Sequence, residues 1–409
     1  MCMKKCSIVI GSLFGDEGKG HMTDILCDSP NTINVRFNGG AQAAHTVVTP
    51  DGKRHAFRHF GAGTFAGAIT YLTEDFLVNP ISFALERDTL KREFNISPRE
   101  IVNPNALVTT LWDMYINQGI ETYRGAKRHG SCGMGINETV ERSKNPRYRI
   151  TVFELLDKVR LREKLKLIQG EYVESRLKEE YGLSISDLPG EYPKLIAEED
   201  AIEMFMFFAD EFVNNVRIFG DGILLNYDNV VFEGAQGLLL DQNNPDCLPE
   251  HCTTSNTGVK NAMKIIQRIG RPAPVDIYYM SRCYMTRHGA GPMMGELLHK
   301  PYENVVDLTN IPNEFQGSLR FGYMDFDLLA REIKKDLKNV SIPANINIAF
   351  TCLDQLDASA KFYQGGYVDS LASSRFLQKA KDIFEEQIPI VNGIYATSGL
   401  TRREIIQFV

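Results

Sequence analysis

A series of glycines follows the first apolar segment of this chain, and their spacing constrains the fold more than any other feature. The apolar run at residues 7–10 leads into residues 11–20, where glycines stand at positions 11, 15, 18 and 20, and a segment able to form a helix follows. Glycines let backbone N–H groups approach a polyphosphate, Lys19 adds an ammonium group, and the helix start adds the positive end of its dipole. The segment therefore predicts a phosphate-binding turn between a strand and a helix.

Two carboxylates lie inside this turn, at Asp16 and Glu17. Negative charge does not suit an anion site unless a carboxylate binds Mg²⁺ or takes a proton from a substrate. The turn also lacks the spacing of a Walker A loop, because Lys19 is followed by Gly20 rather than by a hydroxyl residue. Taken alone, the segment fits equally well a turn whose glycines serve only packing.

Composition and charge exclude several classes of protein. With 409 residues, 43% of them hydrophobic, the chain can bury a large core, and its formal net charge of −7 argues against a nucleic-acid partner. We find no signal peptide and no apolar run of membrane-spanning length, so no membrane partner is expected. The eight cysteines lack Cys-x-x-Cys spacing, which predicts free thiols in a reducing, cytoplasmic compartment and no structural metal.

Short apolar runs alternate with helical or loop segments along the chain. This rhythm predicts an α/β fold with a large, mostly parallel central β-sheet flanked by helices, in a P-loop-like nucleotide-binding architecture. Residues 152–219 instead show helical periodicity with many charged residues, so we expect a helical insertion there within a single domain that spans residues 1–409. The expected strands lie at residues 7–10, 33–37, 229–232, 277–279 and 346–350.

Further glycine-rich segments follow some of these expected strands. His45 follows paired glycines in residues 36–46, which makes it the strongest candidate among the histidines for transition-state contact, although a lone histidine more often has a structural role. Residues 232–241 again place a polar side chain between glycines, and residues 253–258 supply hydroxyl groups that suit a phosphate monoester. Residues 286–296 place a guanidinium in a tight turn.

Taken together, these segments resemble the motifs of the adenylosuccinate synthetase family. Residues 15–20 correspond to its Gly-Asp-Glu-Gly-Lys-Gly loop, and residues 43–46 to its Ala-Gly-His-Thr loop. Residues 233–237 match Glu-Gly-Ala-Gln-Gly and residues 286–292 match the Thr-Arg-x-Gly-x-Gly-Pro turn. The correspondence extends from the first strand to residues 398–399, and on these motifs the chain is identified as a member of that family.

The resemblance implies a two-step ligation. A nucleoside triphosphate phosphorylates the 6-oxygen of a purine nucleoside monophosphate, and the nitrogen of L-aspartate then displaces that phosphate. Asp16 would take the N1 proton and would bind Mg²⁺, with Ala44 as a second metal contact. His45 would stabilise charge on the 6-oxygen and on the transferring phosphoryl group, and Gln236 would orient the purine.

The resemblance also implies which residues contact the nucleotides. Lys19 would hold phosphates, and Ser131 and Thr253 match positions that grip the 5′-phosphate. Arg142 resembles the arginine that the family sends into a neighbouring subunit's site, which implies a homodimer. The complete implied nucleotide-binding set is Gly15, Glu17, Gly18, Lys19, Gly20, Ser131, Arg142, Thr253, Asp354, Ser398 and Gly399.

Three segments depart from the family's pattern. At residues 351–354 the family has Thr-Lys-x-Asp, which contacts guanine, whereas this chain has Cys352 at the lysine position and keeps Asp354. The missing cation makes ATP or dATP a candidate donor beside GTP. The nucleotide-binding turn at residues 130–139 is altered as well, so the acceptor need not be IMP.

The third departure is a shortened aspartate-binding loop at residues 313–322. Arg320 remains there as the arginine able to pair with a carboxylate by bidentate geometry, and Ser318 lies in the same loop. These two residues are the predicted aspartate contacts.

The departures look similar to the phage and archaeal branch that makes N6-succino-2-amino-2′-deoxyadenylate from dGMP. We therefore expect dGMP and ATP as substrates, in the host cytoplasm if a phage encodes the chain, with IMP and GTP as the alternative. Asp16 counts against a full match, since phage members of that branch often carry serine there. A non-catalytic nucleotide-binding protein and a simple NTPase are further alternatives, and both predict no turnover that depends on acceptor and aspartate.

Overall fold

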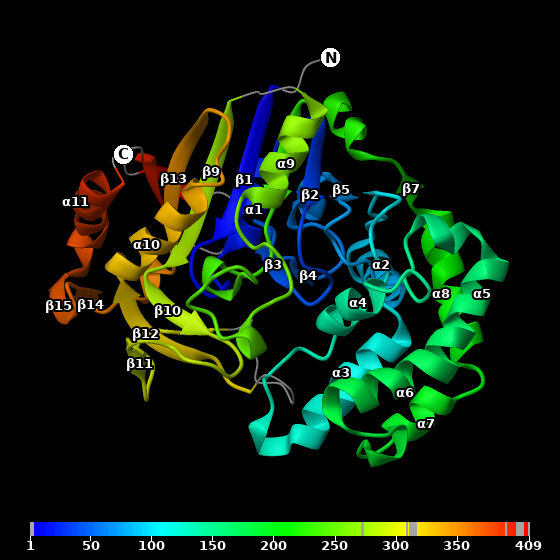
Figure 1. Ribbon diagram of the computed structural model, residues 1–409. Helices are drawn as coiled ribbons and strands as arrows, with labels where there is room; N and C mark the ends of the chain where they lie inside the picture. Colours follow the sequence, from blue (N-terminus) through cyan, green and yellow to red (C-terminus); the bar gives the residue numbers. More distant parts are fainter. Residues whose placement is uncertain are drawn as a thin grey trace.

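The strands form one large, mostly parallel sheet through the middle of the molecule (Figure 1). The computed structural model describes residues 4–270, 274–307, 310, 317–388, 391–397 and 405–407. Every pairing in this ten-stranded sheet is parallel except that of β16 with β17. In spatial order the strands are β17 (Ile405–Gln407), β16 (Val391–Thr397), β13 (Ala344–Thr351), β9 (Val275–Arg282), β1 (Lys5–Gly11), β8 (Asn229–Glu233), β2 (Thr32–Arg36), β5 (Ile69–Leu72), β6 (Glu100–Val102) and β7 (Arg217–Ile218).

Helices cover both faces of this sheet, as the alternation of side chains along β1 requires. Ile8 and Ile10 point into a core shared with helices α9 (Lys260–Ile269), α10 (Phe326–Leu337) and α11 (Phe376–Gln387). Val9, between them, points to the opposite face, where it packs with Met22 of α1 (Lys19–Cys27). All five strands expected from the sequence are present, and the α/β sheet with flanking helices is confirmed.

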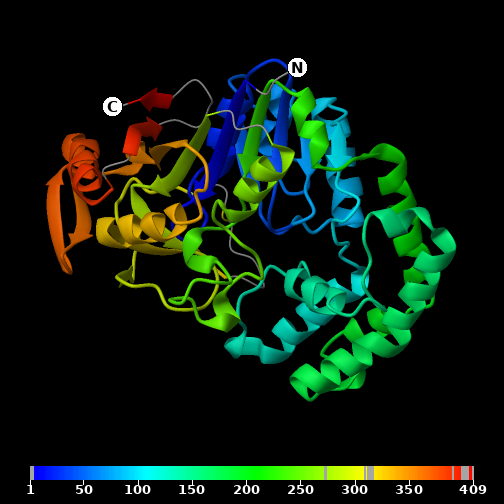
Figure 2. The same ribbon diagram turned by 45° about the horizontal axis from the view of Figure 1, so that its top comes forward.

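A second hydrophobic core lies in a helical part beyond the β7 edge of the sheet (Figure 2). Trp112 is fully buried there, and its Nε1 donates a hydrogen bond to the carbonyl of Ile196 at 3.2 Å. The helices of this core are α2 (Pro80–Phe94), α3 (Leu111–Arg124), α5 (Lys158–Leu167), α6 (Val173–Arg176), α7 (Tyr192–Ala197) and α8 (Ala201–Asn215), and α4 (Ile136–Ser143) lies against α3.

The helices from α5 to α8 lie within residues 152–219, where the sequence favoured helices. The helical core begins earlier than that, however, because α3 supplies Trp112, Ile116 and Ile120 to it. The glycine-rich residues 130–135 separate α3 from the later helices and break the periodicity, so this link was not visible in the sequence.

A smaller sheet and a hairpin complete the fold. The smaller sheet contains β10 (Tyr284–Arg287), β11 (Glu296–Leu297), β12 (Arg320–Asp325), β14 (Ser359–Gln364) and β15 (Tyr367–Ala372), and the hairpin pairs β3 (His45–Val48) with β4 (Arg54–Phe57). Among the described residues, no helix has the length and apolar character needed to cross a membrane.

The topology explains why the three catalytic candidates, Asp16, His45 and Gln236, lie close together. The carboxyl ends of neighbouring parallel strands meet at one edge of a sheet, which is where open α/β sheets bind ligands. Strands β1, β8 and β2 are adjacent, with Val9 and Arg36 both in register with Glu233. The turns that follow these three strands, at residues 12–18, 234–237 and 37–44, therefore converge.

Candidate active site

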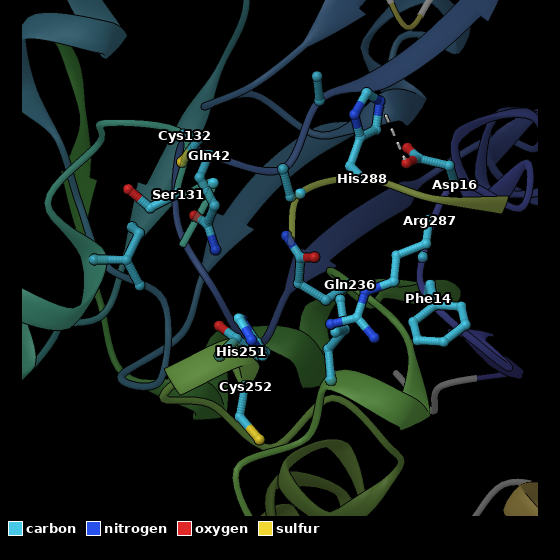
Figure 3. Close-up of a pocket in the computed structure, with 18 of the residues that line it drawn as sticks. Phe14, Asp16, Gln42, Ser131, Cys132, Gln236, His251, Cys252, Arg287 and His288 are labelled. Carbon is cyan, nitrogen blue, oxygen red and sulfur yellow. Dashed lines mark ion pairs between the residues drawn. The ribbon is translucent and has the colours of Figure 1, made fainter. Parts of the chain in front are cut away.

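A cavity of about 350 Å³ opens where these turns converge (Figure 3). The α3–α4 connection and the loops at residues 250–254 and 287–290 form its outer wall. The predicted site residues that line it are Gly15, Asp16, Lys19, Ala44, His45, Ser131, Gln236 and Thr253. One cavity thus brings together candidates from five separate segments of the chain.

The phosphate-binding turn has the backbone conformation that its glycines permit. Gly15 and Gly18 have φ angles of 112° and 87°, and Gly18 precedes α1 as its N-cap. A side chain at Gly15 would also meet the backbone of Gln236, because the nearest atom lies 2.9 Å from an added Cβ. Lys19 is buried, donates to the carbonyl of Gly15 and has a pKa lowered by that burial. The predicted turn between strand and helix is therefore present, and its ammonium group faces the cavity wall.

Glu17 is buried within the turn and does not line the cavity. Its Oε1 accepts the backbone N–H of Leu13 at 2.7 Å, while Oε2 is buried without a hydrogen-bond partner. Burial raises the pKa of Glu17 to about 7, an effect that nearby Lys19 opposes. The nucleotide contact predicted for Glu17 stays a prediction, and its side chain is directed into the turn rather than into the cavity. Gly18 and Gly20 likewise pack against Thr351 and His45 rather than line the cavity.

His45 is held by a buried carboxylate. Its Nδ1 forms a hydrogen bond with Oε1 of Glu233. The other carboxylate oxygen of Glu233, Oε2, accepts a hydrogen bond from the backbone N–H of Ala62 at 3.1 Å. Burial lowers the pKa of His45, and Glu233 opposes that effect. Burial alone would raise the pKa of Glu233, but His45 and Arg36 outweigh it, so this pKa lies below its usual range. Glu233 thus fixes the imidazole through Nδ1 and leaves Nε2 for a ligand.

Asp16 presents its carboxylate at the cavity wall, with about one third of the side chain exposed. Nε2 of His288 lies 3.8 Å from Oδ2 of Asp16, as Figure 3 shows. Ala44 lines the same cavity, so a carboxylate and a backbone carbonyl group are available to a metal ion. Such oxygen ligands fit Mg²⁺, which retains several waters and also binds substrate phosphates. Among the described residues there is no cluster of three or more acidic, histidine or cysteine side chains that could hold a metal by itself.

Gln236 occupies a strained backbone position between two glycines. Its φ is 64°, a left-handed value that non-glycine residues seldom adopt, and its carbonyl packs directly against Gly11. Gln42, which the sequence interpretation did not single out, lines the cavity with both amide atoms buried and unpartnered. Its position between Gly40 and His45 was the sequence feature that could have marked Gln42 as a site residue. The two amides supply hydrogen-bond donors and acceptors on the cavity wall.

Ser131 and Thr253 reach the cavity from opposite loops. The hydroxyl of Ser131 accepts a hydrogen bond from Nδ2 of Asn117 at 2.8 Å, and the neighbouring Thr254 hydroxyl is buried without a partner. These hydroxyls lie on the wall where the sequence interpretation expected a phosphate contact.

Arg142 is not part of the cavity, and the prediction that it reaches a neighbouring subunit is wrong. Its side chain is fully buried on α4, where Nε and Nη2 donate to the two carboxylate oxygens of Asp113 at 2.8 Å each. Nη1 donates to the carbonyl of Tyr148 at 2.6 Å and Nη2 also donates to that of Val108 at 2.7 Å. Every nitrogen of this guanidinium is engaged inside its own chain, so Arg142 has a structural role.

Arg320 is also engaged within the chain. Its Nε donates to Oε1 of Glu296 at 2.8 Å, Nη2 pairs with the other oxygen of Glu296, and Nη1 donates to the carbonyls of Gly289 and Gly291. Neither Arg320 nor the exposed Ser318 lines the cavity. The expected aspartate contacts are therefore not presented to the cavity in this arrangement.

The predicted donor-base residues are only partly described. Asp354 is exposed in a short turn outside the cavity. Cys352, two residues earlier, has a φ of 63°, and its carbonyl accepts a hydrogen bond from the thiol of Cys283. Ser398 and Gly399 lie outside the described residues. The donor contacts of Asp354, Ser398 and Gly399 therefore stay predictions.

The structure corrects one expectation about the cysteines. Cys247 and Cys252 form a disulfide, with their Cα atoms 5.9 Å apart, whereas the sequence interpretation expected free thiols throughout. Cys252 and its neighbours Glu250, His251 and Thr253 line the cavity, so this link closes a loop of the outer wall. Among the other cysteines of the described segments, Cys6, Cys132, Cys283 and Cys352 are free thiols.

A sequence model of one protein family, described as adenylosuccinate synthetase, matches residues 8–362. The adenylosuccinate synthetase of Thermoplasma volcanium is 28% identical over 341 residues, which cover 81% of this chain and 73% of that protein. That of Synechococcus sp. (strain WH7803) is 33% identical over 299 residues, which cover 71% of this chain and 63% of that protein.

Two solved structures share the fold. The fully ligated adenylosuccinate synthetase from Plasmodium falciparum aligns with a TM-score of 0.72 at 17% identity, over 98% of this chain and 99% of that one. A cyanophage S-2L succinoaminodeoxyadenylate synthetase, bound to dGMP and to dATP as energy donor, aligns with a TM-score of 0.58 at 14% identity, over 99% and 95% of the two chains.

Proposed function

Because the chain belongs to the adenylosuccinate synthetase family of carbon–nitrogen ligases, which condense L-aspartate with a purine nucleotide, we propose that its cavity activates the 6-oxygen of IMP with GTP. The observation that carries the proposal is the meeting of Asp16, His45 and Gln236 in one cavity beside the phosphate-binding turn. The names of the relatives favour IMP and GTP over the dGMP and ATP expected from the altered loops.

In the proposed first step, the carboxylate of Asp16 accepts the N1 proton of the acceptor while the 6-oxygen attacks the terminal phosphoryl group. His45, fixed by Glu233, contacts the 6-oxygen through Nε2 as negative charge develops there. Lys19 and the backbone N–H groups of the turn hold the phosphates.

In the proposed second step, the nitrogen of L-aspartate displaces phosphate from C6, and inorganic phosphate leaves. Gln236 keeps the purine in position through both steps. Mg²⁺, held by Asp16 and the carbonyl of Ala44, would neutralise charge on the phosphate oxygens. The remaining chemistry belongs to the side chains at the sheet edge.

A second acceptor, dGMP with ATP or dATP, is favoured by one specific observation. Cys352 stands where the family has a lysine that packs on guanine, and its backbone adopts a left-handed conformation that ends β13 in a turn. Loss of that cation removes a contact to a guanine donor. On this ground we keep ATP or dATP as the alternative donor, and dGMP stays the alternative acceptor because the nucleotide-binding turn at residues 130–139 departs from the family's pattern.

The test measures succinylated product and released phosphate from the purified protein with Mg²⁺ and L-aspartate. Four reactions combine IMP or dGMP as acceptor with GTP or ATP as donor. Turnover that requires acceptor and aspartate together supports the ligase, and the fastest pair identifies the substrates. Triphosphate hydrolysis that needs no acceptor, or no turnover with any pair, would contradict the proposal.

A homodimer stays a prediction, and it no longer rests on Arg142, because that side chain is buried in its own chain. Light scattering across a concentration series, with and without the acceptor nucleotide, measures the oligomeric state directly. A monomer under all of these conditions would contradict the prediction.

A further inference from the structure

We propose that Arg287, rather than Arg320, binds a carboxylate of the amino-acid substrate. The inference rests on the proposed ligase function and assigns a binding role that the sequence interpretation had given to Arg320. It follows from a contrast between two neighbouring arginines, one already paired with an acidic side chain and one not.

Arg287 is a buried cation on the cavity wall. It lies at the end of β10, is 4% exposed and lines the cavity, and its guanidinium stacks over the ring of Phe14 at 4.7 Å (Figure 3). Its Nη1 donates a hydrogen bond to the carbonyl of Pro292, while Nε is buried without a partner. Among the described residues it forms no ion pair with a carboxylate. A buried, unpaired guanidinium is costly unless a ligand supplies the anion.

The electrostatic environment agrees with that geometry. Burial and, after it, the positive charge of Arg320 lower the pKa of Arg287 to about 10, while Glu296 opposes the effect. Glu296 is unavailable to Arg287 because it forms a two-point ion pair with Arg320. An arginine with its own acidic partner shows the opposite shift, as Arg176 does beside Glu138. Of the two neighbouring arginines, Arg287 is therefore the one that gains more from an incoming anion.

A carboxylate suits this position better than a phosphate. The phosphate groups of the nucleotides have Lys19, the backbone of the glycine turn and the hydroxyls of Ser131 and Thr253. L-aspartate brings two carboxylates, and planar guanidinium groups bind carboxylates by two parallel hydrogen bonds. The stacking on Phe14 fixes the plane of the Arg287 guanidinium, which favours such bidentate binding.

The experiment compares Arg287→Gln, Arg287→Lys and a matched control in which Arg320→Met and Glu296→Gln remove the neighbouring ion pair together. Arg287→Gln should raise the KM for L-aspartate by about 10²-fold, as loss of a charge-assisted pair predicts, with the KM values of both nucleotides changed less than about threefold. Arg287→Lys should recover part of the loss. The control pair should change the KM for aspartate less than about threefold.

A second readout does not depend on turnover. Calorimetric titration of L-aspartate into the protein, with the acceptor and a non-hydrolysable triphosphate present, should give binding to the wild type and none to Arg287→Gln. An Arg287→Gln enzyme with an unchanged KM for aspartate, or with a raised KM for a nucleotide instead, would overturn the assignment while leaving the ligase proposal intact. A wild-type protein without acceptor-dependent turnover would contradict the ligase proposal itself. Thermal unfolding confirms that each variant is folded.

Discussion

The cavity has two walls, and they differ in what positions their charged groups. At the sheet edge, Asp16 and Gln236 follow adjacent parallel strands, and Glu233 at the end of β8 holds His45. On the outer wall, Arg287 at the end of β10 is held against Phe14, while Arg320, in register with it on β12 but outside the cavity, pairs with Glu296. Strand order places a side chain regardless of its neighbours, whereas the position of a long arginine side chain depends on the group it contacts, Phe14 for Arg287 and Glu296 for Arg320. The sheet-edge wall should therefore govern chemistry, and the outer wall substrate binding.

The largest expected effect is that of Asp16→Ala at the sheet edge. Removing the proposed base should lower kcat by at least about 10³-fold, because general-base catalysis is typically worth 10² to 10⁴. Nucleotide binding, measured by calorimetry, should weaken less than about tenfold. A variant that keeps full activity would break the assignment of chemistry to this wall.

Arg142→Met tests the arginine that proved to be structural. It leaves Asp113 buried without its partner, so the free energy of unfolding should fall by about 3 to 5 kcal/mol in urea titrations. Replacing Asp113 with Asn in the same chain should recover part of that loss, since the two residues form one unit. A variant of unchanged stability that has lost only nucleotide binding would instead restore the role first expected for Arg142.

Glu233→Gln tests whether catalysis depends on how the His45 ring is held, because the variant keeps His45 but alters the side chain that fixes it. The amide can still accept a hydrogen bond but loses the charge that opposes the lowered pKa of His45. We expect kcat to fall by about 10 to 10²-fold, with nucleotide KM values nearly unchanged, by analogy with the loss of an outer-shell partner. Asn34→Ala is a suitable control, because Asn34 lies in β2 beside Glu233 but does not contact His45. Equal kcat losses in both variants would show that the effect is only structural.

The smaller of the two predicted stability effects is the pH dependence at Glu17. Its pKa is raised from 4.5 to about 7 in the folded protein, chiefly by burial, so the folded state binds this proton more tightly than the unfolded state. The free energy of unfolding should therefore fall as the pH rises from about 4.5 to 7, by about 3 kcal/mol, a shift that already includes the opposing charge of Lys19.

Urea unfolding of Glu17→Gln at pH 5 and at pH 7.5 checks this prediction. The variant lacks the titrating group, so its stability relative to the wild type should rise between the two pH values. An unchanged difference would mean that Glu17 is ionised at both pH values in the folded protein.

Sequence patterns predicted the sheet-edge wall well because its causes are local. Apolar runs followed by glycine turns specify strands and the loops after them, so Asp16, His45 and Gln236 were found before their neighbours were known. The outer wall depends on contacts that no short motif encodes. The same holds for two arginines outside the cavity, because Arg142 pairs with Asp113, 29 residues earlier, and Arg320 pairs with Glu296, 24 residues earlier.

The central claim is that the 6-oxygen of the acceptor is phosphorylated and then displaced, and an isotope label on that oxygen tests it most directly. IMP, or dGMP if that is the faster substrate, carries ¹⁸O at the 6-position, and mass spectrometry then measures the oxygen isotopes in the released phosphate. If the 6-oxygen is phosphorylated at this sheet edge and then displaced by aspartate, each phosphate should carry one ¹⁸O atom from the acceptor. Phosphate without the label, released while product forms, would contradict the account.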